Sequence, residues 1–312
     1  MKILVVWRSR NGGVRLALVD LGSDVMVPAS LFHFCIAKMA FSSEVFTIEH
    51  AGSVATLWLD HPDRRNAMGP AFWEDLPVAM QGLSDDDHVR VVIIAAKGDA
   101  FTVGLDLKAM APMLLQAGQT GSEAQLKRDL YKEIRRFQAA ISSIATCPKP
   151  VIAAVHGYCI GGGVDLITAC DIRLAAADAT FSVRETKMAM VADLGTLQRL
   201  PHIIPQGHVA ELVYTGKDIS AARAQQIGLV NDVYADHEAL LEAAQALAEA
   251  IAANSPLAVQ GAKAVLRAND GRTTEEALDY VALWNTSFLH SNDLREAVTA
   301  FQEKRPATFN GE

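Results

Sequence analysis

Buried strands that end in glycine turns constrain this fold most strongly. Residues 89–98 form a continuous apolar run that ends in glycine, and the apolar run VIAAV at residues 151–155 leads to three consecutive glycines at 161–163. A continuous apolar run bounded by glycine is typical of a strand that is buried on both faces. The pattern therefore predicts an α/β fold with glycine turns at the ends of its strands.

Strand and helix patterns alternate along the rest of the chain. Two alternating runs over residues 46–62 meet at Ala51-Gly52 and predict a β-hairpin. Apolar residues spaced by three and four over residues 122–145 predict a long helix, which Pro148 ends. After about Val233 the pattern is helical throughout, with segments at 237–254, 256–269, 273–290 and 292–303. We expect an α/β core with the active site over residues 41–235 and a C-terminal helical subdomain over 236–312.

The first forty residues do not share the pattern of the remaining chain. Their apolar patches alternate with charged residues, so they lack the apolar centre of a signal peptide and the acid-poor character of a transit peptide. We expect residues 1–40 to be an N-terminal extension that is not native, with Met39 as the natural start. An extra strand or an oligomer contact is the alternative.

Composition narrows the class of partner. The chain has 28 Lys and Arg against 36 Asp and Glu, a net charge of −8, and no long basic run, so we expect no nucleic-acid partner. No apolar run approaches the ~18 residues that span a bilayer, so we expect no membrane partner. Cys35, Cys147, Cys159 and Cys170 form no CxxC pair and no cluster with histidines, which predicts a reduced, cytoplasmic protein without a metal.

Two glycine turns could hold a negatively charged oxygen. FTVGLDL (101–107) and HGYCIGGGVD (156–165) both follow a buried strand. Glycines let the backbone approach a ligand, and a helix that begins there presents unpaired N–H groups with partial positive charge. If the N–H groups of Leu105 and Gly162 converge, they would polarise a thioester carbonyl and stabilise an enolate. Either turn alone could be a packing turn between a helix and a strand.

Three acids come after the glycines. Asp165 stands early in the helix that the glycines open, where it could be a favourable first-turn charge, and Glu185 alone could be a surface acid. Asp193 lies in the very apolar segment MAMVADLGTL, where a lone carboxylate is costly to bury without partners or a raised pKa. A helix cap at Asp193-Leu194-Gly195 is the alternative for Asp193. We expect Asp193 to be the most informative of the three.

Over about residues 44–309 the sequence resembles the crotonase superfamily, the enoyl-CoA hydratases and isomerases. The segments that carry the resemblance are HPDRRNAM, FTVGLDL, KPVIAAVHGYCIGGGVDL, ACDIRLAAADATFSV, GTLQRLP, TGKDISAARAQQIGLVNDV and FQEKRPATF. The resemblance implies a crotonase-like ββα spiral core with a C-terminal helical trimerisation subdomain, assembled as a homotrimer or as a hexamer made of two trimers. It also implies an acyl-CoA thioester substrate and no cofactor, since CoA is part of the substrate.

The same resemblance assigns binding residues. It places the oxyanion hole at the N–H groups of Leu105 and Gly162. The residues that it implies along the CoA and acyl channel are Val103, Gly104, Leu105, Asp106 and Leu107. The candidate contacts to CoA are Arg64, Arg65, Asn66, Ala67 and Met68, together with Phe301 and Lys304, which in the family can belong to a neighbouring subunit. Arg64 and Lys304 could also be ordinary surface charges.

The acids distinguish members of the family. Typical hydratases carry glutamate at the first two acid positions and glycine at the third. Asp165, Glu185 and Asp193 instead resemble the pattern of the delta(3,5)-delta(2,4)-dienoyl-CoA isomerases of fatty-acid beta-oxidation. The alternatives are a 2-enoyl-CoA hydratase, a 3,2-enoyl-CoA isomerase and a crotonase-like binding protein without catalysis.

The chemistry of a dienoyl shift explains why separated acids are needed. Moving two double bonds of a 3,5-dienoyl thioester requires removal of a proton at C2 and delivery of one at C6, which are too far apart for one short side chain. We expect Glu185 to act as base at C2 and Asp193 as acid at C6, with Asp165 tuning or assisting protonation. The sequence leaves open which acid serves which end.

Overall fold

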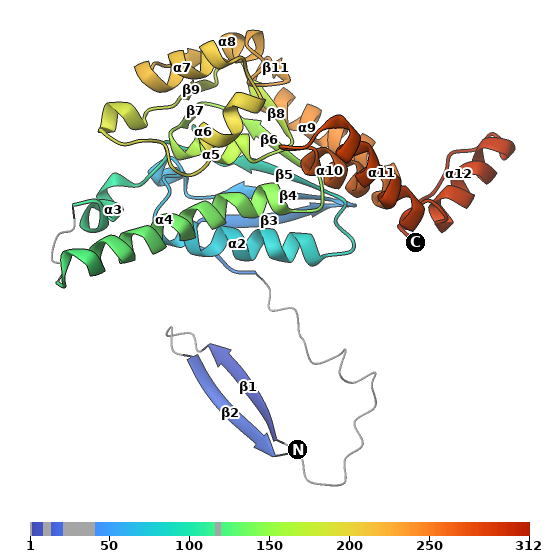
Figure 1. Cartoon of the computed structure of the whole chain (residues 1–312), viewed down its shortest axis with the longest axis horizontal. Coiled ribbons are helices and arrows are strands. Elements are labelled where there is room, and N and C mark those ends of the chain that lie inside the picture. Colours follow the sequence, from blue (N-terminus) through green and yellow to red (C-terminus); the bar gives the residue numbers. More distant parts are fainter. Residues whose placement is uncertain (1, 9–13, 21–40, 116–119) are drawn as a thin grey trace. The chain divides into compact units, whose positions relative to one another are not determined.

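The computed structural model describes residues 2–8, 14–20, 41–115 and 120–312 of the chain. The chain divides into two compact units, Met1–Ala40 and Phe41–Glu312 (Figure 1). In the first unit, β1 (Lys2–Arg8) pairs antiparallel with β2 (Val14–Asp20). The expected start at Met39 and the cysteine Cys35 lie outside the described residues, and the expectation that residues 1–40 are not native stays a prediction.

A six-stranded sheet forms the centre of the second unit, in the order β11-β8-β6-β5-β4-β3. The hairpin predicted at Ala51-Gly52 is confirmed, because β3 (Phe46–Ala51) runs antiparallel to β4 (Val54–Leu59). From β4 onward every neighbouring pair is parallel. These further strands are β5 (Val91–Ala96), β6 (Val151–Val155), β8 (Ile172–Ala176) and β11 (Asp232–Tyr234).

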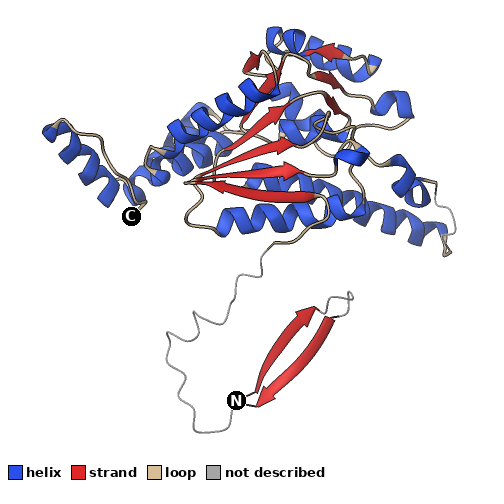
Figure 2. Cartoon of the chain, turned by 180° about the vertical axis from the view of Figure 1, so that it is seen from behind, coloured by secondary structure: helices blue, strands red, loops and turns tan. Residues whose placement is uncertain are grey.

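Both faces of this sheet are covered, which explains the continuous apolar runs. Side chains of β5 alternate: Val92 and Ile94 join the core cluster that contains residues of α2 (Pro70–Asp85) and α4 (Glu123–Thr146). Val91 and Ile93 join a second cluster with residues of α9 (His237–Ala252), which packs across β4, β5, β6 and β8. Figure 2 shows the strands between these helices. The predicted α/β fold is confirmed.

A small second sheet lies next to the glycine turns. It has three strands in the order β10-β9-β7, with β7 (Tyr158–Ile160) parallel to β9 (Thr180–Ser182) and β9 antiparallel to β10 (Ile219–Ser220). Only two residues separate β6 from β7, so the chain passes directly from one sheet to the other. The shorter helices around the two sheets are α3 (Leu107–Leu114), α5 (Gly162–Thr168), α6 (Thr196–Arg199), α7 (Gln206–Thr215), α8 (Ala221–Gln226) and the 3-10 turns η1 (Pro62–Arg64), η2 (Glu185–Met188) and η3 (Leu200–His202).

The four predicted C-terminal helices are present. They are α9, α10 (Pro256–Ala268), α11 (Thr274–Phe288) and α12 (Asn292–Glu303), and Figure 1 shows the last three extending beyond the sheet. Each begins after a polar residue whose side chain accepts a hydrogen bond from a backbone N–H three residues on. Phe41–Glu312 forms one compact unit, and the boundary expected near residue 235 stays a prediction.

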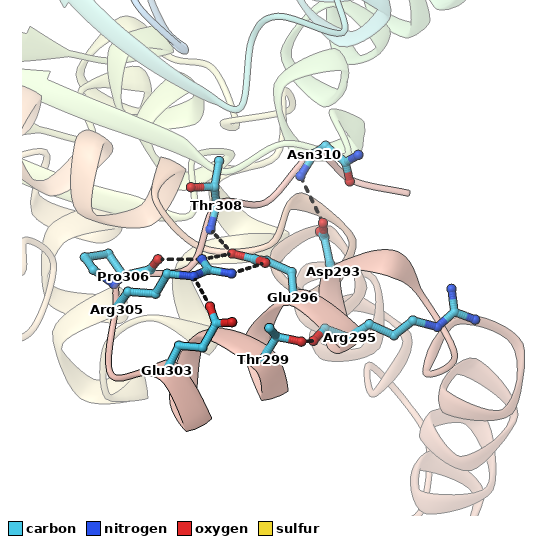
Figure 3. Close-up of polar contacts among 9 residues, drawn as sticks. All are labelled: Asp293, Arg295, Glu296, Thr299, Glu303, Arg305, Pro306, Thr308 and Asn310. Atoms are coloured by element: carbon cyan, nitrogen blue, oxygen red, sulfur yellow. Dashed lines mark hydrogen bonds and ion pairs between the residues drawn. The ribbon is translucent and has the colours of Figure 1, made fainter.

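The end of the chain folds back onto α12 (Figure 3). The guanidinium of Arg305 donates to both carboxylate oxygens of Glu296, at 2.6 and 2.9 Å. The backbone N–H of Asn310 donates to Asp293 at 2.9 Å. Two parallel bonds between a guanidinium and a carboxylate hold a defined geometry, so the segment after α12 is tied to that helix.

Gly157 joins the two sheets, and no other residue fits its place. Its φ is +55°, and an added Cβ would lie 2.2 Å from the backbone oxygen of Asp99. The backbone atom cannot rotate away as a side chain could. Gly52 in the β3–β4 turn has a similar φ of +60°, but nothing lies within 4 Å of an added Cβ there.

We predict that Gly157→Ala lowers the free energy of unfolding by at least about 3 kcal/mol, because a left-handed backbone and a steric overlap both act against the folded state. Gly52→Ala should cost only about 1 kcal/mol, from the backbone conformation alone. Denaturant unfolding followed by circular dichroism measures both. Equal losses of unfolding free energy in the two variants would show that steric overlap with Asp99 does not contribute to the effect at Gly157.

Candidate active site

The two predicted glycine turns lie against each other. The N–H of Thr102 donates to Tyr158 O at 2.8 Å, and the N–H of Ile160 donates to Thr102 O at 3.1 Å. At Gly104, φ is +81°, and an added Cβ would lie 2.6 Å from Ile160 O and 3.4 Å from Gly162 N. Glycine at position 104 is therefore what allows the first turn to approach the second.

The N–H groups of Leu105 and Gly162 are left without acceptors. Leu105 follows Gly104, and Gly162 is the first residue of α5, where N–H groups have no partner within the helix. Neither N–H donates a hydrogen bond to any other residue in the described parts of the chain. Both residues line one cavity. The arrangement suits a carbonyl oxygen that gains negative charge.

This cavity has a volume of about 400 Å³ and brings all three predicted acids together with Leu105 and Gly162. Most of its remaining wall is apolar, which suits an acyl chain. The other lining residues are Trp73, Met113, Leu114, Leu130, Ile134, Phe137, Met190, Val191 and Leu194.

Asp165 is the buried acid of the site. It is 1% exposed, and its Oδ1 accepts a hydrogen bond from the N–H of Thr196 at 2.6 Å. Burial raises the pKa of Asp165 to about 7, although the bond from Thr196 opposes the shift, and the nearby carboxylate of Glu185 adds to it. At neutral pH this carboxyl group can therefore both hold and release a proton.

Glu185 begins η2 and is half-buried. Its Oε2 is buried without a hydrogen-bond partner among the described residues, and its Oε1 would lie 3.2 Å from a Cβ added at Gly161. Burial raises the pKa of Glu185, and the negative charge of Asp193 adds to the effect. An unpartnered carboxylate oxygen beside the glycine turn is free to accept a proton from a ligand.

Asp193 lies on a loop between η2 and α6, and the structure corrects one expectation about it. Asp193 is an exposed residue at the edge of the cavity, so it is Asp165, and not Asp193, whose burial is costly. The loop turns the apolar segment 188–194 toward solvent on one side, which the local composition does not reveal. Partial desolvation still raises the pKa of Asp193.

The segment HPDRRNAM supports the first glycine turn from behind. Met68 is 0% exposed, its N–H donates to Gly104 O at 2.8 Å, and its carbonyl accepts from the N–H of Asp106. The Asn66 side chain is also buried, and its amide nitrogen donates to the carbonyl oxygens of Lys97 and Ala100. Both side chains are used inside the turn, so the predicted contacts of Asn66 and Met68 with CoA stay a prediction that only their backbone atoms could meet. Ala67, between them, is half-buried.

The remaining candidates near the turns differ in exposure. Arg64 and Arg65 are exposed, and Arg64 pairs with the buried Asp106 at 2.8 Å. Asp106 also accepts from the N–H of Ala109 at the start of α3. Among the predicted channel residues, the cavity wall includes Leu105 but not Val103, Gly104, Asp106 or Leu107. CoA contacts at Arg64 and Arg65 stay a prediction.

Phe301 and Lys304 lie apart from this cavity. Phe301 on α12 is 84% exposed, and Lys304 ends α12 in a left-handed conformation, with φ 55°. Neither residue lines the cavity formed by the same chain. Contact between these residues and CoA stays a prediction.

Some features of the site have no clear sequence signal. Thr196 holds Asp165 through a backbone N–H, which any residue type could donate. Gln138 of α4 donates to the carbonyl oxygen of Asp193 at 2.6 Å. The spacing of apolar residues in α4 predicts that Leu130 is on the apolar face, but it does not show that this side chain faces a cavity and not the core.

In the described parts of the chain, no group of three or more His, Cys, Asp and Glu residues could hold a metal ion, and no helix is long and apolar enough to cross a membrane.

A family model described as "Enoyl-CoA hydratase/isomerase" matches residues 49–312. The chain belongs to the enoyl-CoA hydratase/isomerase family. A solved enoyl-CoA hydratase of this family, from Bacillus anthracis, is 31% identical, with a TM-score of 0.78 over 86% of this chain and 100% of that chain. The expected crotonase-like fold is thus confirmed.

Two curated relatives share more of the sequence. The "Delta(3,5)-Delta(2,4)-dienoyl-CoA isomerase, mitochondrial" of Dictyostelium discoideum is 47% identical over 82% of this chain and 87% of its own length. The "Delta(3,5)-Delta(2,4)-dienoyl-CoA isomerase, peroxisomal" of Arabidopsis thaliana is 43% identical over 82% of this chain and 92% of its own length. Within the family, the chain is therefore similar to isomerases over nearly its whole second unit.

The raised pKa of Asp165 gives a testable effect on stability. Its pKa is about 7 in the folded chain against an ordinary value of 3.8, so wild-type protein loses stability as the pH rises through this interval. Asp165→Asn keeps the acceptor for Thr196 but does not ionise. We predict that, relative to wild type, the variant gains about 3 kcal/mol in free energy of unfolding between pH 5 and pH 8. Urea unfolding at the two pH values measures this. If the difference in unfolding free energy between variant and wild type does not change with pH, the pKa of Asp165 is not raised by burial.

Proposed function

We propose that this protein is a delta(3,5)-delta(2,4)-dienoyl-CoA isomerase that acts in fatty-acid beta-oxidation. The observation that carries the proposal is the set of Asp165, Glu185 and Asp193 around one apolar cavity, beside two N–H groups without acceptors. The two curated relatives that carry this activity in their names support it.

The proposed reaction begins at C2. The carboxylate of Glu185, which has an oxygen without a partner, takes a proton from C2 of the 3,5-dienoyl thioester. The electron pair of the broken C–H bond delocalises onto the thioester oxygen, and the N–H groups of Leu105 and Gly162 stabilise the charge on that oxygen. The product of this step is a dienolate, and Glu185 carries the proton.

The reaction ends at C6. Asp193 lines the same cavity, and partial desolvation raises its pKa, which favours the protonated form that the step needs. Transfer of this proton to C6 gives the 2,4-dienoyl thioester, and proton exchange with solvent resets Glu185 and Asp193. Asp165 lies close enough to both acids for their charges to raise its pKa, so its protonation assists or tunes theirs. The net reaction moves one hydrogen and two double bonds.

The proposal needs no cofactor, because only protons move and CoA is part of the substrate. A homotrimer, or a hexamer of two trimers, is proposed from the family. Apolar side chains on the C-terminal helices support it: Leu266, Leu278 and Leu283 are 72%, 62% and 67% exposed. The three described cysteines are free and buried, and they are the support for a cytoplasmic location. The two named relatives are mitochondrial and peroxisomal.

A 2-enoyl-CoA hydratase would use the same cavity differently. It would hold one water between two acids for addition across C2 and C3. Asp165 is one methylene shorter than the glutamate of typical hydratases, and its Oδ1 is already bonded to Thr196. These two features favour the isomerase. Neither a 3,2-enoyl-CoA isomerase nor a binding protein without catalysis would require a third acid such as Asp193.

The two enzymatic activities are separable with purified protein. We predict rapid conversion of a 3,5-dienoyl-CoA to the conjugated 2,4-dienoyl-CoA, and hydration of a 2-enoyl-CoA at least about a hundredfold slower, because Asp165 reaches water poorly. Ultraviolet absorbance follows both reactions. Fast hydration without diene migration would identify a hydratase instead.

Asp193→Asn tests the role of the third acid. The variant keeps the size of the side chain but cannot deliver a proton, so we predict that kcat for the dienoyl substrate falls about a hundredfold to ten-thousandfold. Its affinity for the acyl-CoA should change less than about twofold, because binding to the N–H groups and the apolar wall is retained. Asp270→Asn, at an exposed acid outside the cavity, is the control. An unchanged kcat in Asp193→Asn would remove Asp193 from the mechanism.

A further inference from the structure

The loop that carries Asp193 is held by α4. Gln138 donates a hydrogen bond from its amide nitrogen to the backbone oxygen of Asp193 at 2.6 Å. One turn further along α4, the hydroxyl of Ser142 accepts from Arg199 at 2.9 Å, and Arg199 also contacts Leu194 O at 3.3 Å. The loop is thus attached to the same face of α4 at two places.

The amide of Gln138 has a defined orientation. Its oxygen accepts a hydrogen bond from Arg135 at 2.8 Å, so its nitrogen is the end that faces Asp193. The preceding turns of α4 place Leu130, Ile134 and Phe137 in the cavity wall. One helix therefore both lines the cavity and carries the donor that holds the Asp193 backbone.

The contacts that hold Glu185 do not come from α4. The N–H of Met190 donates to Glu185 O at 3.0 Å, and the hydroxyl of its neighbour Thr186 donates to Val213 O of α7 at 2.9 Å. Neither contact involves α4. Loss of the Gln138 bond should therefore displace the acid at one end of the site and leave the base at the other end in place.

We propose that Gln138 is a positioning residue that holds Asp193 in reach of C6 and so controls the second proton transfer but not the first. This role rests on the proposed isomerase function. A displacement of about 1 Å in a catalytic group can cost as much as a hundredfold in rate, and one side-chain hydrogen bond to a loop accounts for a smaller part of that. We expect a loss of about tenfold when the bond is removed.

Gln138→Met tests the role. Methionine has a similar length and helix propensity but cannot donate a hydrogen bond. The matched control is Gln245→Met on α9, where the amide nitrogen donates to the side chain of Glu249 and the residue lies outside the cavity. The substrate is a 3,5-dienoyl-CoA in D₂O. The measurements are kcat and KM for formation of the 2,4-diene, and deuterium incorporation at C2 of recovered substrate per product formed.

In Gln138→Met we expect kcat to fall about tenfold, KM to stay within about twofold, and deuterium incorporation per product to rise about tenfold. The dienolate lives longer before C6 is protonated, so Glu185 exchanges its proton for solvent deuterium and returns deuterium to C2 more often. Gln245→Met should match wild type in all three. A ratio of incorporation to product that stays at the wild-type value overturns the proposal, whether or not kcat falls. If wild-type protein forms no 2,4-diene, the isomerase function itself fails. If it does and only the ratio is unchanged, Gln138 alone is excluded.

Discussion

The close approach of two backbone turns is the constraint on which the site depends. A Cβ at Gly104 would lie 2.6 Å from the backbone oxygen of Ile160, so this position requires the absence of a side chain. A Cβ at Gly162 would lie 2.7 Å from Met68 Sδ, so a side chain there would displace Met68. The approach leaves the N–H groups of Leu105 and Gly162 without acceptors at the wall of one cavity. Strands β6 and β7 and the segment around Met68 hold the turns in this arrangement. Buried N–H groups without acceptors are unfavourable in a stable fold, and they persist where a ligand supplies the acceptor.

The three acids are a second unfavourable feature of the site, and the stability of the rest of the fold compensates for their free-energy cost. Asp165, Glu185 and Asp193 share one cavity with few hydrogen bonds, and each has a raised pKa. Desolvation is the largest cause for all three, and mutual repulsion adds to it at Asp165 and Glu185. A shift to about 7 at Asp165 corresponds to about 4 kcal/mol of lost stability when that group ionises. The sheet buried on both faces supplies the stability that offsets such a site.

Much of the secondary structure can be predicted from local pattern. The hairpin, the buried strands, the long helix α4 and the four C-terminal helices could be predicted because period, caps and proline act over a few residues. The exposure of Asp193 could not, since the apolar letters around it belong to a loop at the cavity edge. Asn66 and Met68 match a family motif for CoA contact, yet their side chains serve the turn itself. A motif shows where a segment lies and does not show which way each side chain points.

The sequence by itself determined the α/β class, the two glycine turns, the three acids and the resemblance to the family, because each depends on residue type and on spacing along the chain. Only the tertiary structure decided which acid is buried, that the turns meet, and that α4 holds the Asp193 loop through Gln138. It also decided that Phe301 lies away from the cavity of its own chain. Burial and hydrogen bonding between residues 31 to 57 positions apart depend on how whole elements pack, which no local pattern contains.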